Sequence, residues 1–201
     1  MTKYVINSGN VRGDKGKAKK YFAEVFKDLG NEPKVLLCSF ANPREEWEDR
    51  FQNYIGDFHN YLAEGVRPIY KMAMPAEFVE QSKEADIIWI NGGDDDLVKC
   101  RLSKFNLKDI WKGKVIAVSS ASSDVVASSF WTCDWRKCFE GFGLVPIKFI
   151  PHFNSDYGNS DPRGAIDWGK AKEELAKYGD KSLPIYSLEE GDFAVFEMSI
   201  H

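Results

Sequence analysis

The stretch "VIAVSSASSDVVASSF", Val115–Phe130, decides how this chain folds. Its first four residues have the length and apolar character of a buried strand, and Ser119, Ser120, Ser122 and Ser123 follow almost at once. A helix-like segment comes next. Serine is a weak strand former and is favoured where its side chain bonds to the backbone of a turn. The stretch therefore predicts a strand-to-helix turn whose serine cluster has a function.

The rest of the chain repeats this alternation of short apolar runs and segments with helical periodicity. Near-continuous apolar strands that alternate with helices are typical of a mostly parallel sheet with helices on both faces. We expect a single α/β domain over residues 1–201, a three-layer α/β/α sandwich that ends in a C-terminal hairpin around "EEGD". The predicted strands are 3–7, 34–40, 67–72, 86–90, 114–119, 144–150, 183–188 and 193–198, and the predicted helices are 17–30, 43–65, 75–85, 94–105 and 164–179, with one more after the serine cluster.

Composition and charge exclude several classes of function. The chain has 201 residues, of which 43% are hydrophobic and 29% charged, as in an ordinary globular protein. A net charge of -4 argues against a nucleic-acid partner, because neutralising phosphates needs a basic surface. No apolar run approaches the ~18 residues of a membrane helix, and the N-terminus lacks a secretory signal. We expect a cytoplasmic protein, monomer or homodimer, without a membrane partner.

The cysteines do not indicate a metal site. Cys38, Cys100, Cys133 and Cys138 are scattered and lack CxxC spacing. We expect reduced thiols that are mostly buried, and no metal or organic cofactor.

Polar clusters directly follow three of the predicted strands. They are Asn91–Asp96, Ser119–Ser123 and His152–Asp156. In open parallel sheets, ligands bind beyond the carboxyl ends of the strands. We therefore expect the three clusters on one rim of the sheet, and the active site among them.

Either Ser119 or Ser120 could be a nucleophile on this rim. A tight strand-to-helix turn lifts the hydroxyl off the sheet, and the next amide points at the reacting carbonyl. Small neighbours suit such a turn, and the residues two positions away are alanines for Ser119 but a valine and a serine for Ser120. The alternative interpretation is that these serines simply cap a helix.

A serine nucleophile needs a base, and the chain has three histidines. His59 falls within an amphipathic helix and His201 is the last residue, so His152 is the one well placed on the rim. The glycines of "NGGDDD" could supply an oxyanion donor, whereas its three aspartates would repel a phosphate. Glu189 or Glu190 could orient the histidine.

Together these motifs resemble the dipeptidase E (α-aspartyl dipeptidase) family of serine peptidases, related to cyanophycinase, with a class I glutamine amidotransferase-like, flavodoxin-like fold. The family pattern has a "GGGN" loop, then "GxSAG[AS]", "PH[FY]" and "LPEG". Residues 86 to 197 match it in order, more than half of the chain. The matching motifs are "NGGDD" (Asn91–Asp95), "VSSASS" (Val118–Ser123), "PHF" (Pro151–Phe153) and "LEEG" (Leu188–Gly191).

The resemblance implies a serine peptidase that hydrolyses short peptides through a Ser-His-Glu triad and an acyl-enzyme. Carried over by position, it makes Ser120 the nucleophile, His152 the general base and Glu190 the acid that orients the imidazole. It places the oxyanion hole at the amides of Gly93 and Ala121.

Two alternatives remain beside this assignment. Alignment on Ser120 puts the apolar Val125 on the inner side of the helix, whereas alignment on Ser119 would bury Asp124. Asp134, beyond the nucleophile, is the alternative acid.

The chain departs from the family pattern at several positions. Val118 and Ser122 replace both glycines around the nucleophile, and a β-branched residue at a strained turn could cost ~1–3 kcal/mol. Asp94 and Asp95 bring negative charge to the substrate side, which disfavours an acidic N-terminal residue, while Arg163 could pair with a substrate carboxylate. These departures favour an alternative function, a catalytically impaired family member that binds a small molecule or peptide.

Overall fold

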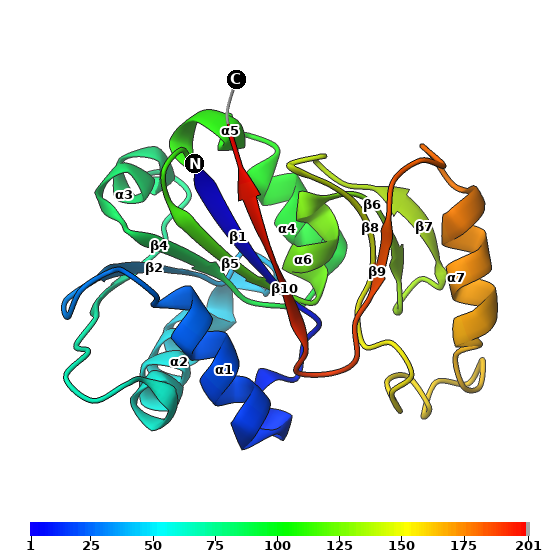
Figure 1. Ribbon diagram of the computed structural model, residues 1–201, viewed down its shortest axis with the longest axis horizontal. Helices are drawn as coiled ribbons and strands as arrows, with labels where there is room; N and C mark the ends of the chain where they lie inside the picture. The colour runs from blue at the N-terminus through cyan, green and yellow to red at the C-terminus, as the bar shows by residue number, and fades with distance from the viewer. Residues whose placement is uncertain (200–201) are drawn as a thin grey trace.

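The computed structural model describes residues 1–199, and its framework is a six-stranded, mostly parallel sheet. The strands lie in the order β10-β1-β5-β4-β2-β3; all are parallel except β10, which runs antiparallel along β1 at one edge (Figure 1). The strands are β1 (Thr2–Asn7), β2 (Lys34–Cys38), β3 (Ile69–Met72), β4 (Ile87–Ile90), β5 (Val115–Ser119) and β10 (Phe193–Met198).

Helices cover both faces of this sheet, as the sequence predicts (Figure 1). Successive strand residues point to opposite faces, so Val115 and Ala117 of β5 pack with α1 and α2, whereas Ile116 and Val118 join the core on the other side. That second core also contains Val125 of α6. The helices are α1 (Lys15–Val25), α2 (Trp47–Tyr61), α3 (Phe78–Glu84), α4 (Asp95–Leu102), α5 (Leu107–Ile110), α6 (Ala121–Val126) and α7 (Trp168–Lys177), with short 3-10 helices at Val11–Gly13 and Arg44–Glu46.

A second, four-stranded sheet lies beyond α6 (Figure 1). Its order is β7-β6-β8-β9, and only β7 is antiparallel to its neighbour. Its inner face shares the core around α6, and its outer face packs against α7 through a separate small cluster. The strands are β6 (Ala127–Thr132), β7 (Lys137–Glu140), β8 (Val145–Ile150) and β9 (Ile185–Ser187).

The predicted C-terminal hairpin is wrong, although both of its strands exist. β9 pairs with β8 of the second sheet, and β10 pairs with β1 of the first. Between them, the amide of Asp192 donates to the carbonyl oxygen of Glu189 in a turn, and the amide of Gly191 donates to the carbonyl oxygen of Gly9. Each strand thus covers an edge whose backbone groups would otherwise lack partners. The turn joins two sheets instead of folding one strand onto the next.

The segment after the serine cluster also differs from its prediction. The helix ends at Val126, and the chain continues at once into β6, which pairs with β7 on one side and with β8 on the other. The aromatic residues of "ASSFWT" suit a strand. Its partners lie further along the chain, so local periodicity does not reveal the pairing.

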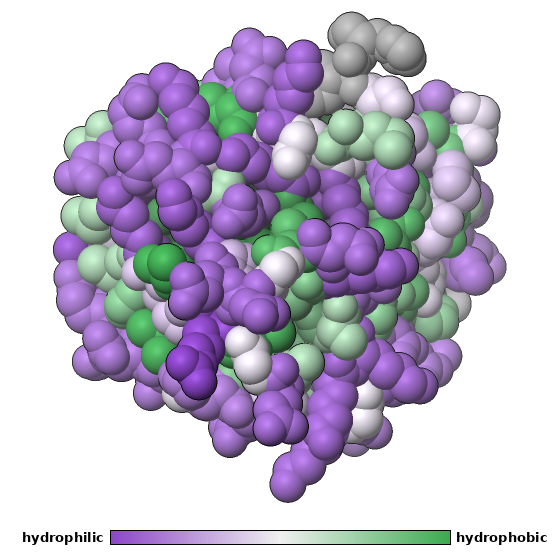
Figure 2. Space-filling model, turned by 60° about the vertical axis from the view of Figure 1, so that its left-hand side comes forward, coloured by the Kyte–Doolittle hydropathy of each residue, from purple (hydrophilic) through white to green (hydrophobic). Residues whose placement is uncertain are grey.

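The surface is mainly hydrophilic on the face shown in Figure 2, with hydrophobic residues in patches between polar ones. Among residues 1–199, the exposed large hydrophobic side chains are Met1, Ile69, Trp135 and Val195. Across residues 1–199, no helix has both the length and the apolar character needed to cross a membrane.

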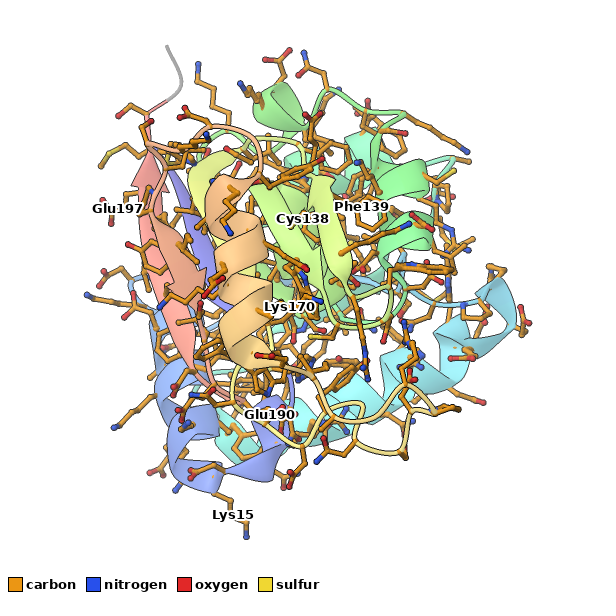
Figure 3. The ribbon with its side chains drawn as sticks, turned by 90° about the vertical axis from the view of Figure 1, so that its right-hand side faces the viewer. Lys15, Cys138, Phe139, Lys170, Glu190 and Glu197 are labelled. Atoms are coloured by element: carbon orange, nitrogen blue, oxygen red, sulfur yellow. The ribbon has the colours of Figure 1, made fainter. Side chains whose placement is uncertain are left out.

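The cysteines are free thiols, as expected, but only half of them are buried. Cys38 and Cys133 are buried, Cys138 is partly buried and Cys100 is exposed. Cys138 lies on β7 beside α7, well away from Glu190 (Figure 3).

Candidate active site

The turn after β5 holds Ser120 in a conformation that residues other than glycine rarely adopt. Its φ is 50° and its ψ is -119°. The Ser120 amide donates to the carbonyl oxygen of Asn7 at 3.0 Å, and the Ser120 carbonyl accepts from the amides of Ser123 and Asp124. The turn is therefore fixed to β1 on one side and to α6 on the other, and such a turn presents its hydroxyl above the sheet.

Both residues that replace the family's glycines fit the turn without displacing Ser120. Val118 has no exposed surface and lies in the core between the sheet and α6. The buried Ser122 hydroxyl lies 2.7 Å from the carbonyl oxygen of Ile90 and accepts a hydrogen bond from the amide of Ser119 at 2.9 Å. Ser122 therefore ties the turn to β4, a contact that glycine could not make.

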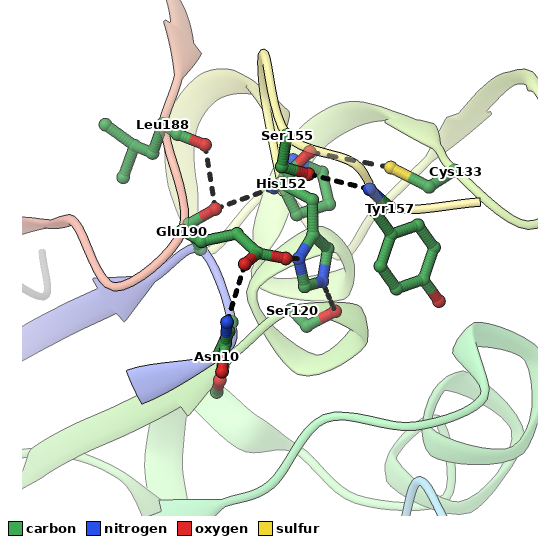
Figure 4. A network of polar contacts seen from close by, with 12 residues as sticks. Asn10, Ser120, Cys133, His152, Ser155, Tyr157, Leu188 and Glu190 are labelled. Atoms are coloured by element: carbon green, nitrogen blue, oxygen red, sulfur yellow. Dashed lines mark hydrogen bonds and ion pairs between the residues drawn. The ribbon is translucent and has the colours of Figure 1, made fainter. Parts of the chain in front are cut away.

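Three residues that are distant in the sequence form one hydrogen-bonded chain at this rim (Figure 4). The Ser120 Oγ atom lies 3.0 Å from Nε2 of His152, and Nδ1 of His152 lies 2.9 Å from Oε1 of Glu190. Both are ordinary hydrogen-bond distances. Ser119 points elsewhere, and its Oγ lies 3.4 Å from Oδ1 of Asn7. Of the two candidate serines, only Ser120 contacts the imidazole.

The imidazole of His152 is held from several directions. Its φ of 53° places the residue in the left-handed region, and its amide donates to Oγ of Ser8 at 2.7 Å. The ring of Tyr157 stacks on it with the centroids 4.2 Å apart. Gly9 approaches so closely that a Cβ atom there would lie 2.4 Å from Cε1 of the ring. Only glycine fits at that position while the ring keeps this orientation.

Glu190 is oriented by a residue that the sequence reasoning missed. Nδ2 of Asn10 donates to Oε2 of Glu190 at 2.6 Å, which leaves Oε1 for His152 (Figure 4). Lys17 holds the Glu190 backbone with a 3.0 Å hydrogen bond from Nζ to the carbonyl oxygen. Ser8, Gly9 and Asn10 directly follow Asn7, the last residue of β1. The strand-end rule that selected the other polar clusters applies equally to this one.

Three other predicted residues are engaged elsewhere in the protein. Oδ1 of Asp134 accepts a hydrogen bond from the Tyr157 hydroxyl at 2.9 Å, whereas Nδ1 of His152 is bonded to Glu190. Asp94 caps α4 by accepting from the amide three residues on. Arg163 forms an ion pair with Asp161 and bonds to the Asp134 carbonyl. A substrate contact by Asp94 or Arg163 stays a prediction.

The glycine loop after β4 lies beside the serine turn. A Cβ atom on Gly92 would lie 3.0 Å from Cβ of Ser120. Gly93 has a φ of 151°, and a Cβ atom there would meet the carbonyl oxygen of Ala41 at 2.3 Å, so this position requires glycine. Within residues 1–199, the amides of Gly93 and Ala121 donate to no protein acceptor. Gly93 is exposed, whereas Ala121 is buried at the start of α6.

Comparison with known proteins identifies the family. The model of peptidase family S51 matches residues 5–197. The chain belongs to peptidase family S51. The resemblance to dipeptidase E drawn from the motifs is thereby confirmed, and the protein is a peptidase by family. No curated protein matches the sequence.

Solved structures similar to this S51 chain share its fold. A peptidase from an acI-B1 Actinobacterium superimposes with a TM-score of 0.66 at 21% identity, over 98% of this chain and 83% of the other. A candidate peptidase E from Listeria monocytogenes EGD-e gives a TM-score of 0.64 at 14% identity, over 99% of this chain and all of the other. At such identities the likeness establishes the α/β architecture alone.

The pKa of His152 in the S51 chain is lowered from its ordinary value of 6.5. Burial lowers it, because the imidazolium ion loses its hydration, while the hydrogen bond and the charge of Glu190 partly oppose this effect. His152 is therefore neutral at neutral pH. Its Nε2 is then free to accept a proton from Ser120.

We expect this pKa to set the acid limb of the pH profile. The value of kcat/KM should rise with pH as His152 loses its proton, with a midpoint below about 6.5, and reach a plateau by neutral pH. Initial rates on one dipeptide between pH 4.5 and 8 measure it. A midpoint above pH 7 would contradict the assigned environment of the ring.

A buried carboxyl pair lies next to the Ser120 turn, and it corrects one expectation drawn from the sequence. Asp124, expected outside the interior when the motif is aligned on Ser120, is only 2% exposed and hydrogen-bonds Asp95. Burial raises the pKa of Asp124 well above its usual range and that of Asp95 to about 6, and neighbouring carboxylate charges contribute to both shifts. Within residues 1–199, no group of three or more His, Cys, Asp or Glu side chains is arranged to hold a metal ion.

Asp124→Asn is expected to stabilise the protein at pH 8, by about 1–3 kcal/mol. A carboxyl whose pKa is raised on folding binds its proton more tightly in the folded state. Stability therefore falls as pH rises above the ordinary value of 3.8, through a folded pKa of about 6 for Asp95 and through the higher folded pKa of Asp124. The asparagine amide can donate to Asp95 at any pH, so this dependence should flatten.

Urea unfolding at pH 5 and pH 8 measures the effect. Asp96→Asn, beside Asp95 on α4 but exposed, is the matched control and should change stability by at most about 0.5 kcal/mol. Equal changes in both variants would contradict the role of the buried pair.

Proposed function

We propose that this S51 peptidase is a serine exopeptidase that hydrolyses short peptides through an acyl-enzyme. The observation that carries the proposal is the hydrogen-bonded chain from Ser120 Oγ through His152 to Glu190. A serine hydroxyl is a weak nucleophile until an adjacent base accepts its proton, and a base works best when a third group orients it. The family resemblance supports short peptides as the substrates.

The reaction begins when Nε2 of His152 takes the proton of Ser120 and Oγ attacks the scissile carbonyl carbon. The carbonyl oxygen becomes an oxyanion, which the free amides of Gly93 and Ala121 stabilise. Glu190 holds the Nδ1–H tautomer and stabilises the imidazolium ion. His152 then passes the proton to the leaving amine, the C–N bond breaks, and an acyl-Ser120 ester remains.

Water completes the cycle by the same route. His152 takes a proton from the water as the water oxygen attacks the ester carbonyl, and a second oxyanion forms between the same two amides. Collapse of this intermediate breaks the ester bond and returns the proton to Ser120 Oγ. No group beyond these residues and water is needed for the atoms to balance.

Incubation with a mixed library of dipeptides, tripeptides and octapeptides tests the proposal. Mass spectrometry should show products from the dipeptides or tripeptides and none from the octapeptides. The impaired, purely binding family member predicts a different result, a rise in melting temperature with a ligand but no product. That outcome, unchanged in Ser120→Ala, would replace the proposal.

A further inference from the structure

A cavity of about 250 Å³ lies at the rim of the six-stranded sheet, on the face covered by α1 and α2. Its walls are largely aromatic, from α1, α2 and β4. Tyr54 and Trp89 approach edge-on, with their centroids 6.4 Å apart. The four aromatic residues of the wall are Phe22, Tyr54, Tyr61 and Trp89.

Two residues that line the cavity are direct neighbours of the candidate active site. Asn10 lines the cavity and also donates the hydrogen bond that fixes Oε2 of Glu190. Ser119 lines it and immediately precedes Ser120. One residue therefore separates the cavity from each of two members of the hydrogen-bonded chain. Asn10 lies between the cavity and Glu190, and Ser119 lies between the cavity and Ser120.

The charges at the cavity are already paired. Arg12 forms an ion pair with Asp57 at 2.9 Å, and its guanidinium lies over the Tyr54 ring, 5.5 Å from the centroid. The protein's own arginine thus occupies both the carboxylate and the aromatic face that a cationic ligand would use. Because Asp57 neutralises Arg12, the cavity does not favour an acidic side chain either. What remains for a ligand is neutral aromatic surface.

We infer that this aromatic pocket, the cavity between Asn10, Ser119 and the four aromatic residues, receives a neutral aromatic or large aliphatic side chain adjacent to the scissile bond. The inference rests on the proposed function and names its substrate class. Pockets for drug-sized ligands measure roughly 300–1,000 Å³, so a cavity of about 250 Å³ is suited to one side chain. An aspartate or glutamate there would lose hydration beside an arginine that is already paired with Asp57.

Dipeptide kinetics test the inference. We expect kcat/KM for Phe-Ala or Ala-Phe to exceed that for Ala-Ala by about 10- to 100-fold, and Asp-Ala and Ala-Asp to be the poorest substrates. The position of the preferred phenylalanine shows which side of the scissile bond the pocket serves. Val11→Trp, which fills the pocket from its edge, should bring the Phe-to-Ala ratio close to one. Val195→Trp, the same substitution at an exposed site on β10, should leave the ratio unchanged.

Equilibrium binding to Ser120→Ala separates a failure of this inference from a failure of the proposed function. Calorimetry with the same dipeptides should show the phenylalanine preference and its loss in Ser120→Ala/Val11→Trp. If binding is selective but the wild-type protein yields no product, the pocket stands and the catalytic proposal fails. If phenylalanine gives no advantage in hydrolysis or in binding, or if its advantage survives Val11→Trp, the pocket assignment is overturned.

Discussion

Replacing Ser120 with alanine is expected to lower kcat/KM for short peptides by about 10⁴- to 10⁶-fold, since the loss of a serine nucleophile in a comparable triad costs about 10⁶. The alanine keeps the backbone of the turn but removes the single oxygen that lies 3.0 Å from His152 Nε2. Without it no acyl-enzyme forms. Initial rates at high enzyme concentration measure the loss, and a melting curve shows whether the turn still folds.

Ser119→Ala is the control variant that distinguishes between the two candidate nucleophiles. The Ser119 hydroxyl lies 3.4 Å from Oδ1 of Asn7 and makes no contact with the imidazole. Its removal should lower kcat/KM by less than about tenfold, because it changes only the surroundings of the site. The opposite pattern, with Ser119→Ala inactive and Ser120→Ala active, would show that the motif had been aligned one residue too late.

Glu190→Gln is expected to lower kcat/KM by about 10³- to 10⁴-fold, comparable with the effect of replacing the acid in other triads. Glutamine has nearly the same shape but carries no charge, so it no longer stabilises the imidazolium ion. Its amide group can also favour the wrong tautomer of His152. Because the Glu190 hydrogen bond and charge raise the pKa of His152, the acid limb of the residual activity should move to lower pH. The kcat/KM profile of the variant measures both effects.

Two further variants decide whether Glu190 alone acts as the acid. Glu189→Gln removes the same charge from the preceding, exposed residue and should have little effect on kcat/KM. Asp134→Asn alters the carboxylate that accepts from the Tyr157 hydroxyl, and it should cost less than tenfold, through the stacking of Tyr157 on His152. A loss in Asp134→Asn as large as in Glu190→Gln would contradict the assignment.

The rim of the sheet could be predicted from the sequence because each of its parts is local. Apolar runs of strand length identify β4, β5 and β8, and a polar cluster follows the carboxyl end of each strand. The expectation that all three clusters lie on one rim of a single sheet is wrong, because β8 belongs to the second sheet and His152 approaches Ser120 from there. Ser120 and His152 are about 30 residues apart in the sequence. They could still be assigned to one site, because the topology brings the ends of the strands that precede them together. Family motifs supplied the identity of Glu190, which follows no such rule.

The remaining features depend on tertiary pairing, which local patterns do not encode. β9 and β10 are close in sequence and have a turn between them, yet each completes the edge of a different sheet. Asp124 is buried beside Asp95, which comes from another helix. The aromatic pocket combines side chains from α1, α2 and β4, each of which looks like ordinary core on its own. Helical or strand periodicity assigns such residues to a face but not to a cavity.

Labelling with a fluorophosphonate, followed by peptide mass spectrometry, tests the central claim most directly, because the reagent reacts with serines whose proton is taken by an adjacent base. In the wild-type protein the adduct should lie on the peptide that contains Ser120, at that residue. In His152→Gln, which folds around the same turn but lacks the base, labelling should be lost. An unlabelled wild-type protein, or equal labelling with and without His152, would contradict an activated Ser120.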